Sequence, residues 1–148
     1  MQITDMLEKD LMILELKARN KEEVVGELVE ALVKKEIVSS KDSFVNTVME
    51  REKMSSTGIG MGIAIPHGKS NVVSKPSIVF GKSVEGIDYQ SLDGEPSYIF
   101  FLIAVPEDSN NEHLKVLSQL SRRLMHEEVR KKLMASKKEA EVISAFQE

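Results

Sequence analysis

The sequence has 148 residues, of which 41% are hydrophobic and 30% charged, the size and balance of one globular domain. The formal net charge of −4 gives no bulk attraction to nucleic acid. The absence of cysteine excludes disulfides, thiol catalysis within the chain and cysteine-ligated metals. No segment approaches the run of about 20 apolar residues that spans a bilayer, and the first residues lack a signal-peptide pattern. We therefore expect a cytoplasmic protein with no nucleic-acid partner and no direct membrane insertion.

The first part of the chain predicts a strand followed by two helices. The short apolar run over residues 11–16 is typical of a strand. Asn20 and Glu23 form a capping-box pattern at the start of an amphipathic helix. Ser39 and Ser40 begin a second helix, "KDSFVNTVMEREKM", which ends shortly before a glycine-rich stretch.

The middle of the chain predicts three strands. "GIAI" is typical of a short strand that ends at Pro66, and residues 76–84 predict a second strand. Asp93 and Gly94 indicate a turn. The run "YIFFLIAV" is apolar throughout, as expected of a strand that is covered on both faces.

The last third of the chain predicts three helices. The first, in "NNEHLKVLSQLSRRLM", can be capped by Asn110 or Asn111, and "EEVRKKLMA" and "KKEAEVISAF" follow. Strands and helices thus interleave along the whole chain. We therefore expect a single α/β domain over residues 1–148, with a mixed, mostly parallel β-sheet flanked by helices.

The segment "STGIGMGIAIPHGKS" ends in Gly68-Lys69-Ser70, which resembles the end of a nucleotide-binding loop. The first glycine of that motif would fall at Ile63, and the preceding segment is predicted to be a helix rather than a strand. ATP binding that depends on Lys69 therefore remains the least favoured hypothesis. The alternate glycines exceed what a simple turn needs, and we expect a bare-backbone patch that could bind anionic oxygens.

His67 is the strongest candidate for a reactive residue. Pro66 restricts the backbone before it, and strand ends in α/β folds are where functional sites gather. An imidazole with a pKa near its reference value of about 6.5 is largely neutral and nucleophilic at neutral pH. The alternative is a surface or core histidine with no catalytic role, which Pro66 and the strand end make less favoured.

Other reactive groups fit known frameworks poorly. His113 begins the helix after the apolar strand and could lie near His67, although a solvated first-turn residue is the simpler interpretation. Arg51 could present a planar fork to a phosphoryl group, or be an ordinary helix-surface charge. No histidine spacing typical of zinc sites occurs, and no serine lies in a nucleophile elbow. We expect no metal and no cofactor.

The segments "REKMSSTGIGMGIAIPHGKS" and "NNEHLKVLSQLSRRLM" resemble the enzyme IIA domain of the bacterial phosphoenolpyruvate-dependent sugar phosphotransferase system, fructose/mannitol class. The resemblance covers essentially the whole chain. It implies a phosphotransferase with a phosphohistidine intermediate, in which His67 accepts a phosphoryl group from the histidine-containing phosphocarrier protein. His67 would pass that group to a cysteine of a IIB domain, which phosphorylates sugar during membrane transport.

The same resemblance implies supporting residues. Arg51 and His113 match positions that support the phosphoryl group in that family, and Thr57 matches a residue that lines the pocket. We also expect backbone amides of residues 56–58 to face the phosphoryl oxygens. Sugar specificity is most similar to the fructose class, but mannitol IIA domains and nitrogen-related regulatory IIA proteins share the histidine signature. A regulatory role of phosphorylated His67 is therefore the alternative.

Overall fold

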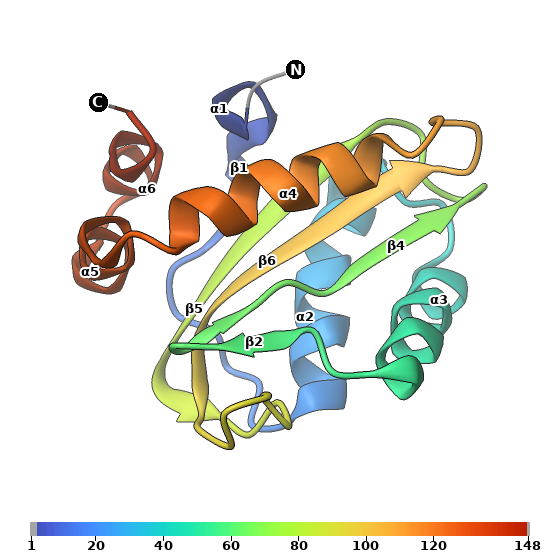
Figure 1. The fold of residues 1–148 in the computed structure, drawn as a ribbon. Coiled ribbons are helices and arrows are strands. Elements are labelled where there is room, and N and C mark those ends of the chain that lie inside the picture. The colour runs from blue at the N-terminus through green and yellow to red at the C-terminus, as the bar shows by residue number, and fades with distance from the viewer. Residues whose placement is uncertain (1–2, 148) are drawn as a thin grey trace.

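The computed structural model describes residues 3–147, which form a six-stranded mixed β-sheet with helices on both faces (Figure 1). The elements in chain order are α1 (Ile3–Met6), β1 (Leu7–Ile13), α2 (Lys21–Lys34), α3 (Lys41–Met54), β2 (Gly58–Gly60), β3 (Ile63–Ala64), β4 (His67–Ser70), β5 (Ser77–Ile87), β6 (Ser97–Pro106), α4 (Glu112–Leu124), α5 (Glu127–Ala135) and α6 (Glu139–Ala145). The strand order is β1-β5-β6-β3-β2, and β4 also pairs with β6.

The α/β prediction is confirmed, with one refinement of the strand directions. The pairs β1–β5, β3–β6 and β4–β6 are parallel. The longest pairing in the described part of the sheet, β5 with β6, is antiparallel, as is β2 with β3. The sheet is therefore mixed around an antiparallel centre.

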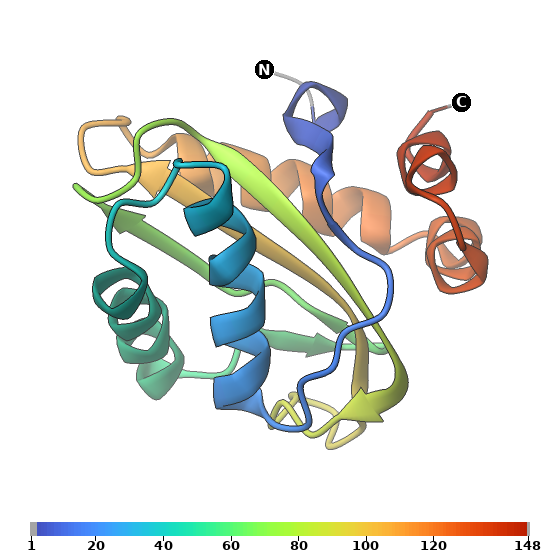
Figure 2. The same cartoon turned by 180° about the vertical axis from the view of Figure 1, so that it is seen from behind.

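Each face of the sheet buries its own hydrophobic core. On β6, Phe101, Ile103 and Val105 face the core under α4, α5 and α6, whereas Phe100 and Leu102 face the core under α2 and α3. The strand period of two sends alternate side chains to opposite faces. Figure 1 shows α4 across one face of the sheet, and Figure 2 shows α2 and α3 across the other. The apolar run over residues 98–105 is thus covered on both faces, as predicted.

The strands β3 and β4 lie one after the other along the same edge of β6. Ile63 pairs with Ile99 and His67 pairs with Ile103, while β5 occupies the other edge of β6. The interruption falls at Ile65 and Pro66, and the carbonyl of Pro66 accepts a hydrogen bond from the Ile103 amide at 3.0 Å. His67 therefore begins β4 instead of ending the preceding strand. The prediction that His67 ends a strand is thus wrong. Pro66 lies at the break between β3 and β4, where its missing N–H costs no strand hydrogen bond.

The alternate glycines belong to the hairpin between β2 and β3. Gly60 has φ of 97°, a left-handed conformation that favours glycine, and it is followed by Met61 at φ of 58°. A Cβ atom on Gly60 would lie 3.0 Å from Oδ2 of Asp93, in the loop that covers the hairpin. The turn and this close approach give a conformational reason for glycine at this position, and the bare-backbone patch that binds anionic oxygens stays a prediction.

The helix starts follow local capping rules in part. The Asn20 side chain accepts a hydrogen bond from the Glu23 amide at 2.9 Å, and the Ser40 hydroxyl accepts one from the Ser43 amide at 3.3 Å. The Glu23 carboxylate, however, accepts from the Arg19 amide instead of closing the box on Asn20. Asn111 caps α4 by position, without a side-chain bond.

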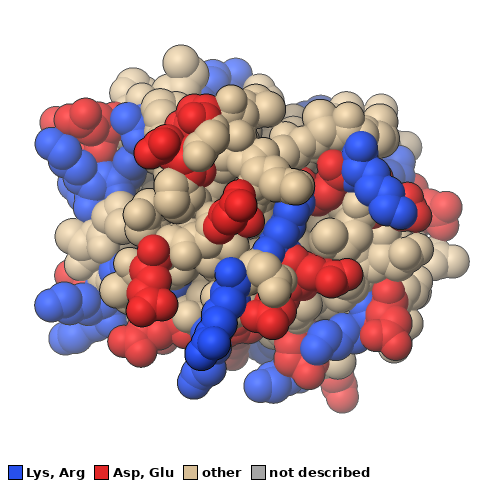
Figure 3. All heavy atoms as spheres, turned by 90° about the horizontal axis from the view of Figure 1, so that it is seen from below, with Lys and Arg blue, Asp and Glu red and all other residues tan. Residues whose placement is uncertain are grey.

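The strand β1 begins earlier than predicted, at Leu7, and the short helix α1 was not predicted. Within residues 3–147, no helix has the length and apolar character needed to cross a bilayer. Seen from below, Lys and Arg side chains alternate with Asp and Glu over the surface (Figure 3), in keeping with the modest net charge of −4.

Candidate functional site

His67 lies at the sheet edge, on the face that α4 covers. It pairs in register with Ile103, whose side chain belongs to the core under α4, and paired residues of neighbouring strands share a face. Only 8% of His67 is exposed. The residue is therefore held by packing, and a small part of it remains exposed.

One ring nitrogen of His67 is committed to the backbone. Nδ1 lies 2.9 Å from the carbonyl oxygen of Ile65. Because a carbonyl oxygen can only accept, Nδ1 carries the proton, and Nε2 of the neutral ring holds the free lone pair. The break between β3 and β4 is what turns this carbonyl toward the ring. The group that fixes the tautomer is thus a backbone carbonyl, which sequence reasoning could not identify.

His113 comes from the first turn of α4 and meets His67 at the sheet edge. The two ring centroids lie 6.3 Å apart, and the ring planes are tilted by 34°. Nδ1 of His113 is buried and has no hydrogen-bond partner among the residues that the structure describes. The prediction that His113 lies near His67 is therefore confirmed. Within the described residues, Nδ1 of His113 is available for a hydrogen bond.

Both histidines favour the neutral form. Burial lowers the pKa of His67 below its ordinary value, the bond to Ile65 opposes that shift, and the positive charge of Arg51 adds to it. Burial also lowers the pKa of His113, and the charges of His67 and Lys69 contribute. The result is an uncharged imidazole pair beside cationic side chains.

Arg51 approaches from the other face of the sheet, in the last turn of α3. Its Nη1 donates a hydrogen bond to the Ser55 carbonyl at 3.1 Å, and its charge acts on His67. The site thus lies where helices from both faces meet at one sheet edge. Among the residues that the structure describes, the other guanidinium donors have no hydrogen-bond partner, and they can bind a further group.

Thr57 is buried, and its polar groups already have partners. Its amide donates to Oε1 of Glu52 at 3.1 Å, and its hydroxyl donates to Oε2 of the same carboxylate. The Gly58 amide donates to the Ser56 hydroxyl at 3.0 Å. The expectation that the amides of Thr57 and Gly58 face phosphoryl oxygens is therefore wrong for this structure.

Sequence reasoning missed the groups that support these residues. Glu52, Tyr89 and Lys21 form a buried cluster around Thr57. Glu52 stands among charged helix residues in "MEREKM", a pattern typical of a solvated face. No local signal marks it as buried, because its partners come from distant segments.

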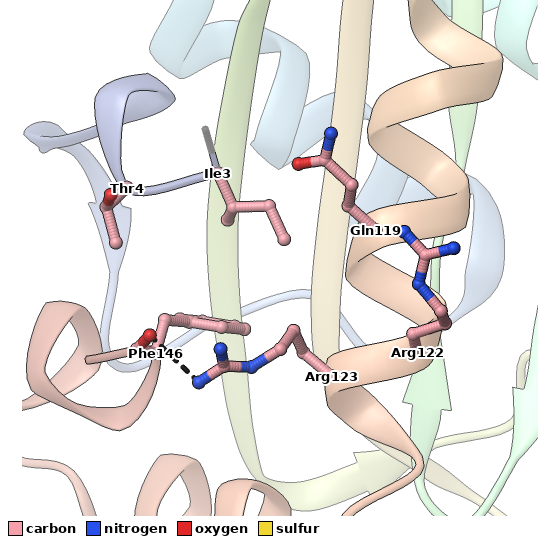
Figure 4. A pocket seen from close by; sticks show the side chains of 6 residues that line it. All are labelled: Ile3, Thr4, Gln119, Arg122, Arg123 and Phe146. Carbon is pink, nitrogen blue, oxygen red and sulfur yellow. Dashed lines mark hydrogen bonds between the residues drawn. The ribbon is translucent and has the colours of Figure 1, made fainter. Parts of the chain in front are cut away.

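No group of three or more His, Asp or Glu side chains suited to a metal ion occurs within residues 3–147. A hollow of about 330 Å³ lies elsewhere, between α1, α4 and α6 (Figure 4). In that hollow, Nη2 of Arg123 donates to the Phe146 carbonyl at 2.9 Å. It contains neither His67, His113 nor Arg51. The candidate site is thus an open edge and not this cavity.

The chain has relatives among characterised proteins. It is 44% identical over 143 residues to the PTS system fructose-specific EIIABC component of Bacillus subtilis, which covers 97% of the chain and 22% of that protein. It is 42% identical over 125 residues to the PTS system fructose-specific EIIA component of Haloferax volcanii, covering 84% of the chain and 81% of the relative. The chain therefore spans less than a quarter of the first relative and most of the second.

Solved structures share the fold. The nitrogen regulatory protein IIA-Ntr from Neisseria meningitidis matches with a TM-score of 0.89 and 30% identity over 97% of both chains. Enzyme IIAMTL from Escherichia coli, solved in complex with phosphorylated enzyme IIBMTL, matches with a TM-score of 0.81 and 29% identity over 94% of this chain and 95% of that one.

A sequence model of the family described as "Phosphoenolpyruvate-dependent sugar phosphotransferase system, EIIA 2" matches residues 5–148. This match covers both the histidine segment and the helix that carries His113. The chain belongs to the EIIA 2 family of the phosphoenolpyruvate-dependent sugar phosphotransferase system.

Proposed function

We propose that His67 carries a phosphoryl group between two partner proteins during sugar uptake. The observation that carries this proposal is the state of the imidazole, with Nδ1 bonded to the Ile65 carbonyl and Nε2 left as the nucleophile. His113 lies beside that ring, and the positive charge of Arg51 acts on it. A phosphoryl acceptor requires this combination of a fixed nucleophile and nearby donors.

The transfer comprises two displacements at phosphorus. In the first, the Nε2 lone pair forms an N–P bond as the N–P bond of the donor's phosphohistidine breaks, and the bonding pair returns to the donor ring. In the second, a cysteine thiolate forms an S–P bond as the Nε2–P bond breaks, and that pair returns to Nε2. The proton stays on Nδ1 throughout and remains hydrogen-bonded to the Ile65 carbonyl. Both steps need positioning and charge stabilisation more than covalent machinery.

Donors around the ring would stabilise the phosphoryl oxygens. The free guanidinium donors of Arg51 suit two oxygens of one phosphoryl group, and the imidazole of His113 can donate a hydrogen bond to another. Thr57 supports the same pocket. Its hydroxyl proton is committed to Glu52, so its contribution is to hold the segment next to the phosphoryl group.

The family and its relatives support two partner proteins. The donor is the histidine-containing phosphocarrier protein, and the acceptor is the cysteine of a IIB domain of a membrane sugar permease. A IIA protein of this fold has been solved together with a phosphorylated IIB protein. The Bacillus subtilis and Haloferax volcanii relatives, at 44% and 42% identity, are fructose-specific components, which supports fructose as the sugar.

Reconstituted transfer tests the proposal. The protein is incubated with phosphoenolpyruvate, enzyme I and the phosphocarrier protein, and the modified residue is mapped by mass spectrometry at alkaline pH. We expect one phosphoryl group on His67, and none on a His67→Ala variant. Candidate IIB domains are then added to find which cysteine accepts the group. Full labelling of His67→Ala would refute the assignment.

A regulatory role is the second candidate, because the nitrogen regulatory protein IIA-Ntr matches this fold with a TM-score of 0.89. In that case phosphorylation of His67 would add about −1.5 to −2 charge and change the binding of a partner. Transfer from phosphorylated His67 to a fructose IIB cysteine favours transport. Stable phosphorylation without transfer to any IIB domain favours regulation.

A further inference from the structure

The buried carboxylate of Glu52 takes no direct part in the transfer described above. The side chain of Glu52 is 2% exposed and accepts from the Lys21 ammonium at 2.9 Å. It also accepts from the Tyr89 hydroxyl at 3.1 Å, and from the amide and the hydroxyl of Thr57. Each oxygen of this carboxylate therefore has two donors, which is the arrangement that a buried carboxylate requires.

This cluster is not explained by stability alone. Removing two charges from water is costly, and apolar side chains of similar volume often give equal or greater stability. Burial and the negative charge of Glu52 raise the pKa of Tyr89, so its hydroxyl remains a donor. Lys21 also lies 4.7 Å above the Tyr89 ring centroid. The chain thus brings Lys21, Thr57 and Tyr89, from three separate segments, around the carboxylate of Glu52.

A continuous series of hydrogen bonds connects Glu52 to His67. The carboxylate holds Thr57 by its amide and its hydroxyl. The Thr57 carbonyl accepts from the Ile65 amide at 3.0 Å, and the Ile65 carbonyl lies 2.9 Å from Nδ1 of His67. The position of Thr57 therefore determines where the Ile65 carbonyl meets the ring.

A second branch connects the same carboxylate to Arg51. Ser55 lies two residues before Thr57, and its carbonyl accepts from Nη1 of Arg51. The Ser56 hydroxyl donates to the Tyr89 carbonyl at 2.9 Å. Residues 55–57 are thus fixed from both sides, by Glu52 and by the backbone of Tyr89.

We propose that Glu52 is a positioning residue for both His67 and Arg51. Its carboxylate anchors residues 55–57, and this anchor places the Ile65 carbonyl against Nδ1 of His67 and the Ser55 carbonyl against the guanidinium of Arg51. The effect of Glu52 on phosphoryl transfer rests on the proposed function of His67. The effect of Glu52 on the tautomer of His67 is independent of that function.

The main variant is Glu52→Gln, which keeps the shape and removes the charge. A glutamine amide must present donors where the carboxylate accepted, and Lys21 loses its anion. The matched control is Glu50→Gln, on the same helix, because Glu50 is 57% exposed in its side chain and pairs only with Lys53 in the structure as described.

The first readout is ¹⁵N NMR of the His67 ring in the unphosphorylated protein. We expect Glu52→Gln to reduce the share of the Nδ1-protonated tautomer. We also expect it to lower the pKa of His67 further, because the charge of Glu52 favours protonation of the ring. Glu50→Gln should match the wild type. A wild-type His67 spectrum in folded Glu52→Gln overturns the proposal.

The second readout is the rate of phosphorylation by the phosphocarrier protein. Because small displacements of reacting groups are costly, we expect Glu52→Gln to be slower by about 10- to 100-fold, with Glu50→Gln unchanged. An unchanged rate in Glu52→Gln overturns the proposal. A wild-type protein that accepts no phosphate would instead refute the proposed function, and the NMR comparison would still decide the role of Glu52.

Tyr89→Phe provides an independent variant if Glu52→Gln does not fold. It removes one donor to Glu52 and keeps the ring under Lys21. Its control is Tyr98→Phe, the other tyrosine of the chain. We expect Tyr89→Phe to change the His67 tautomer in the same direction as Glu52→Gln. A His67 spectrum in Tyr89→Phe equal to that of Tyr98→Phe overturns the proposal.

Discussion

At the scale of a single residue, the burial of His67 links the site to the stability of the fold. Its pKa is lower in the folded chain than the ordinary value of 6.5, chiefly because of burial. Protonation is therefore opposed by the folded state. The stability associated with neutral His67 is fully present above about pH 6.5 and is lost as the pH falls through the lowered pKa.

We therefore predict that the free energy of unfolding declines with acidification just below pH 6.5, and that His67→Gln flattens this decline because glutamine does not titrate. Urea unfolding at about pH 8 and about pH 5 measures the difference. An equal decline in both proteins would mean that other groups carry the dependence.

Arg51→Ala and His113→Ala should fold normally and transfer slowly. Loss of one donor to developing charge costs on the order of 10²-fold in rate. The unfolding free energy should change by less than about 1 kcal/mol, because Arg51 is partly exposed and the buried nitrogen of His113 has no partner to lose within the described residues. Single-turnover phosphorylation and thermal melts check both statements. Wild-type rates would refute the roles of these residues and leave that of His67 intact.

Residues were predictable where a local motif or a family pattern marks them. His67 follows a proline in a distinctive segment, and the site residues Arg51 and His113 came from the resemblance. Glu52 was not predictable, because its burial depends on Lys21 and Tyr89, which lie far away in the sequence. The Ile65 carbonyl was not predictable for a similar reason, since it lies at a break between β3 and β4 that depends on their pairing with β6.

At the scale of elements, helices were predicted more accurately than strands. The helices α2 and α3 carry their own caps and apolar faces, so their limits are local properties. The strand β4 reads "HGKS", which has no apolar alternation. It is a strand because β6 supplies its hydrogen-bond partners, and such non-local pairing is invisible in a short window of sequence.

The contact between β4 and α3 gives an element-scale prediction at Gly68. A Cβ atom there would lie 3.0 Å from Cε1 of Phe44 and 3.3 Å from Cγ2 of Thr47. We expect Gly68→Ala to destabilise the protein by about 1–3 kcal/mol, because the core under α3 must shift. Phosphorylation should slow as well, because the displaced strand carries His67.

Gly26→Ala is the matched control for Gly68→Ala. Gly26 lies inside α2, and a Cβ atom there meets nothing within 4 Å. Alanine should therefore stabilise the helix by about 0.5–1 kcal/mol. Urea midpoints of the two variants should move in opposite directions. A Gly68→Ala midpoint at or above the wild-type value would show that β4 and α3 tolerate the added methyl group.

At the scale of the whole molecule, the layered α/β architecture followed from the interleaved pattern, whereas the direction of the central pair did not. The loop between β5 and β6 contains the turn signal Asp93-Gly94, which favours an antiparallel connection, but interleaved helices favour a parallel sheet. The long antiparallel β5–β6 ladder agrees with the turn signal and not with the parallel expectation. This geometry leaves one edge of β6 for β3 and β4.

Because phosphorylation changes the net charge, electrophoretic mobility can count the phosphoryl groups on the chain. The unmodified chain carries −4, and one phosphoryl group adds about −1.5 to −2. We expect a single shift toward the anode on a native gel after incubation with the donor system, and none for His67→Ala. A second shifted band would indicate a second phosphorylated residue.

The uncharged carbonyl that bonds Nδ1 of His67 also affects how much free energy a phosphorylated ring would retain. A carboxylate on Nδ1 would stabilise a positively charged ring, as the aspartate of a hydrolytic triad does. The Ile65 carbonyl has no charge to offer, so the phosphorylated ring gains little extra stabilisation from that side. The N–P bond would then keep most of the free energy that is released when the phosphoryl group is transferred. On this basis the exchange would run readily in both directions, and the relative abundance of phosphorylated and free partners would set the net flow.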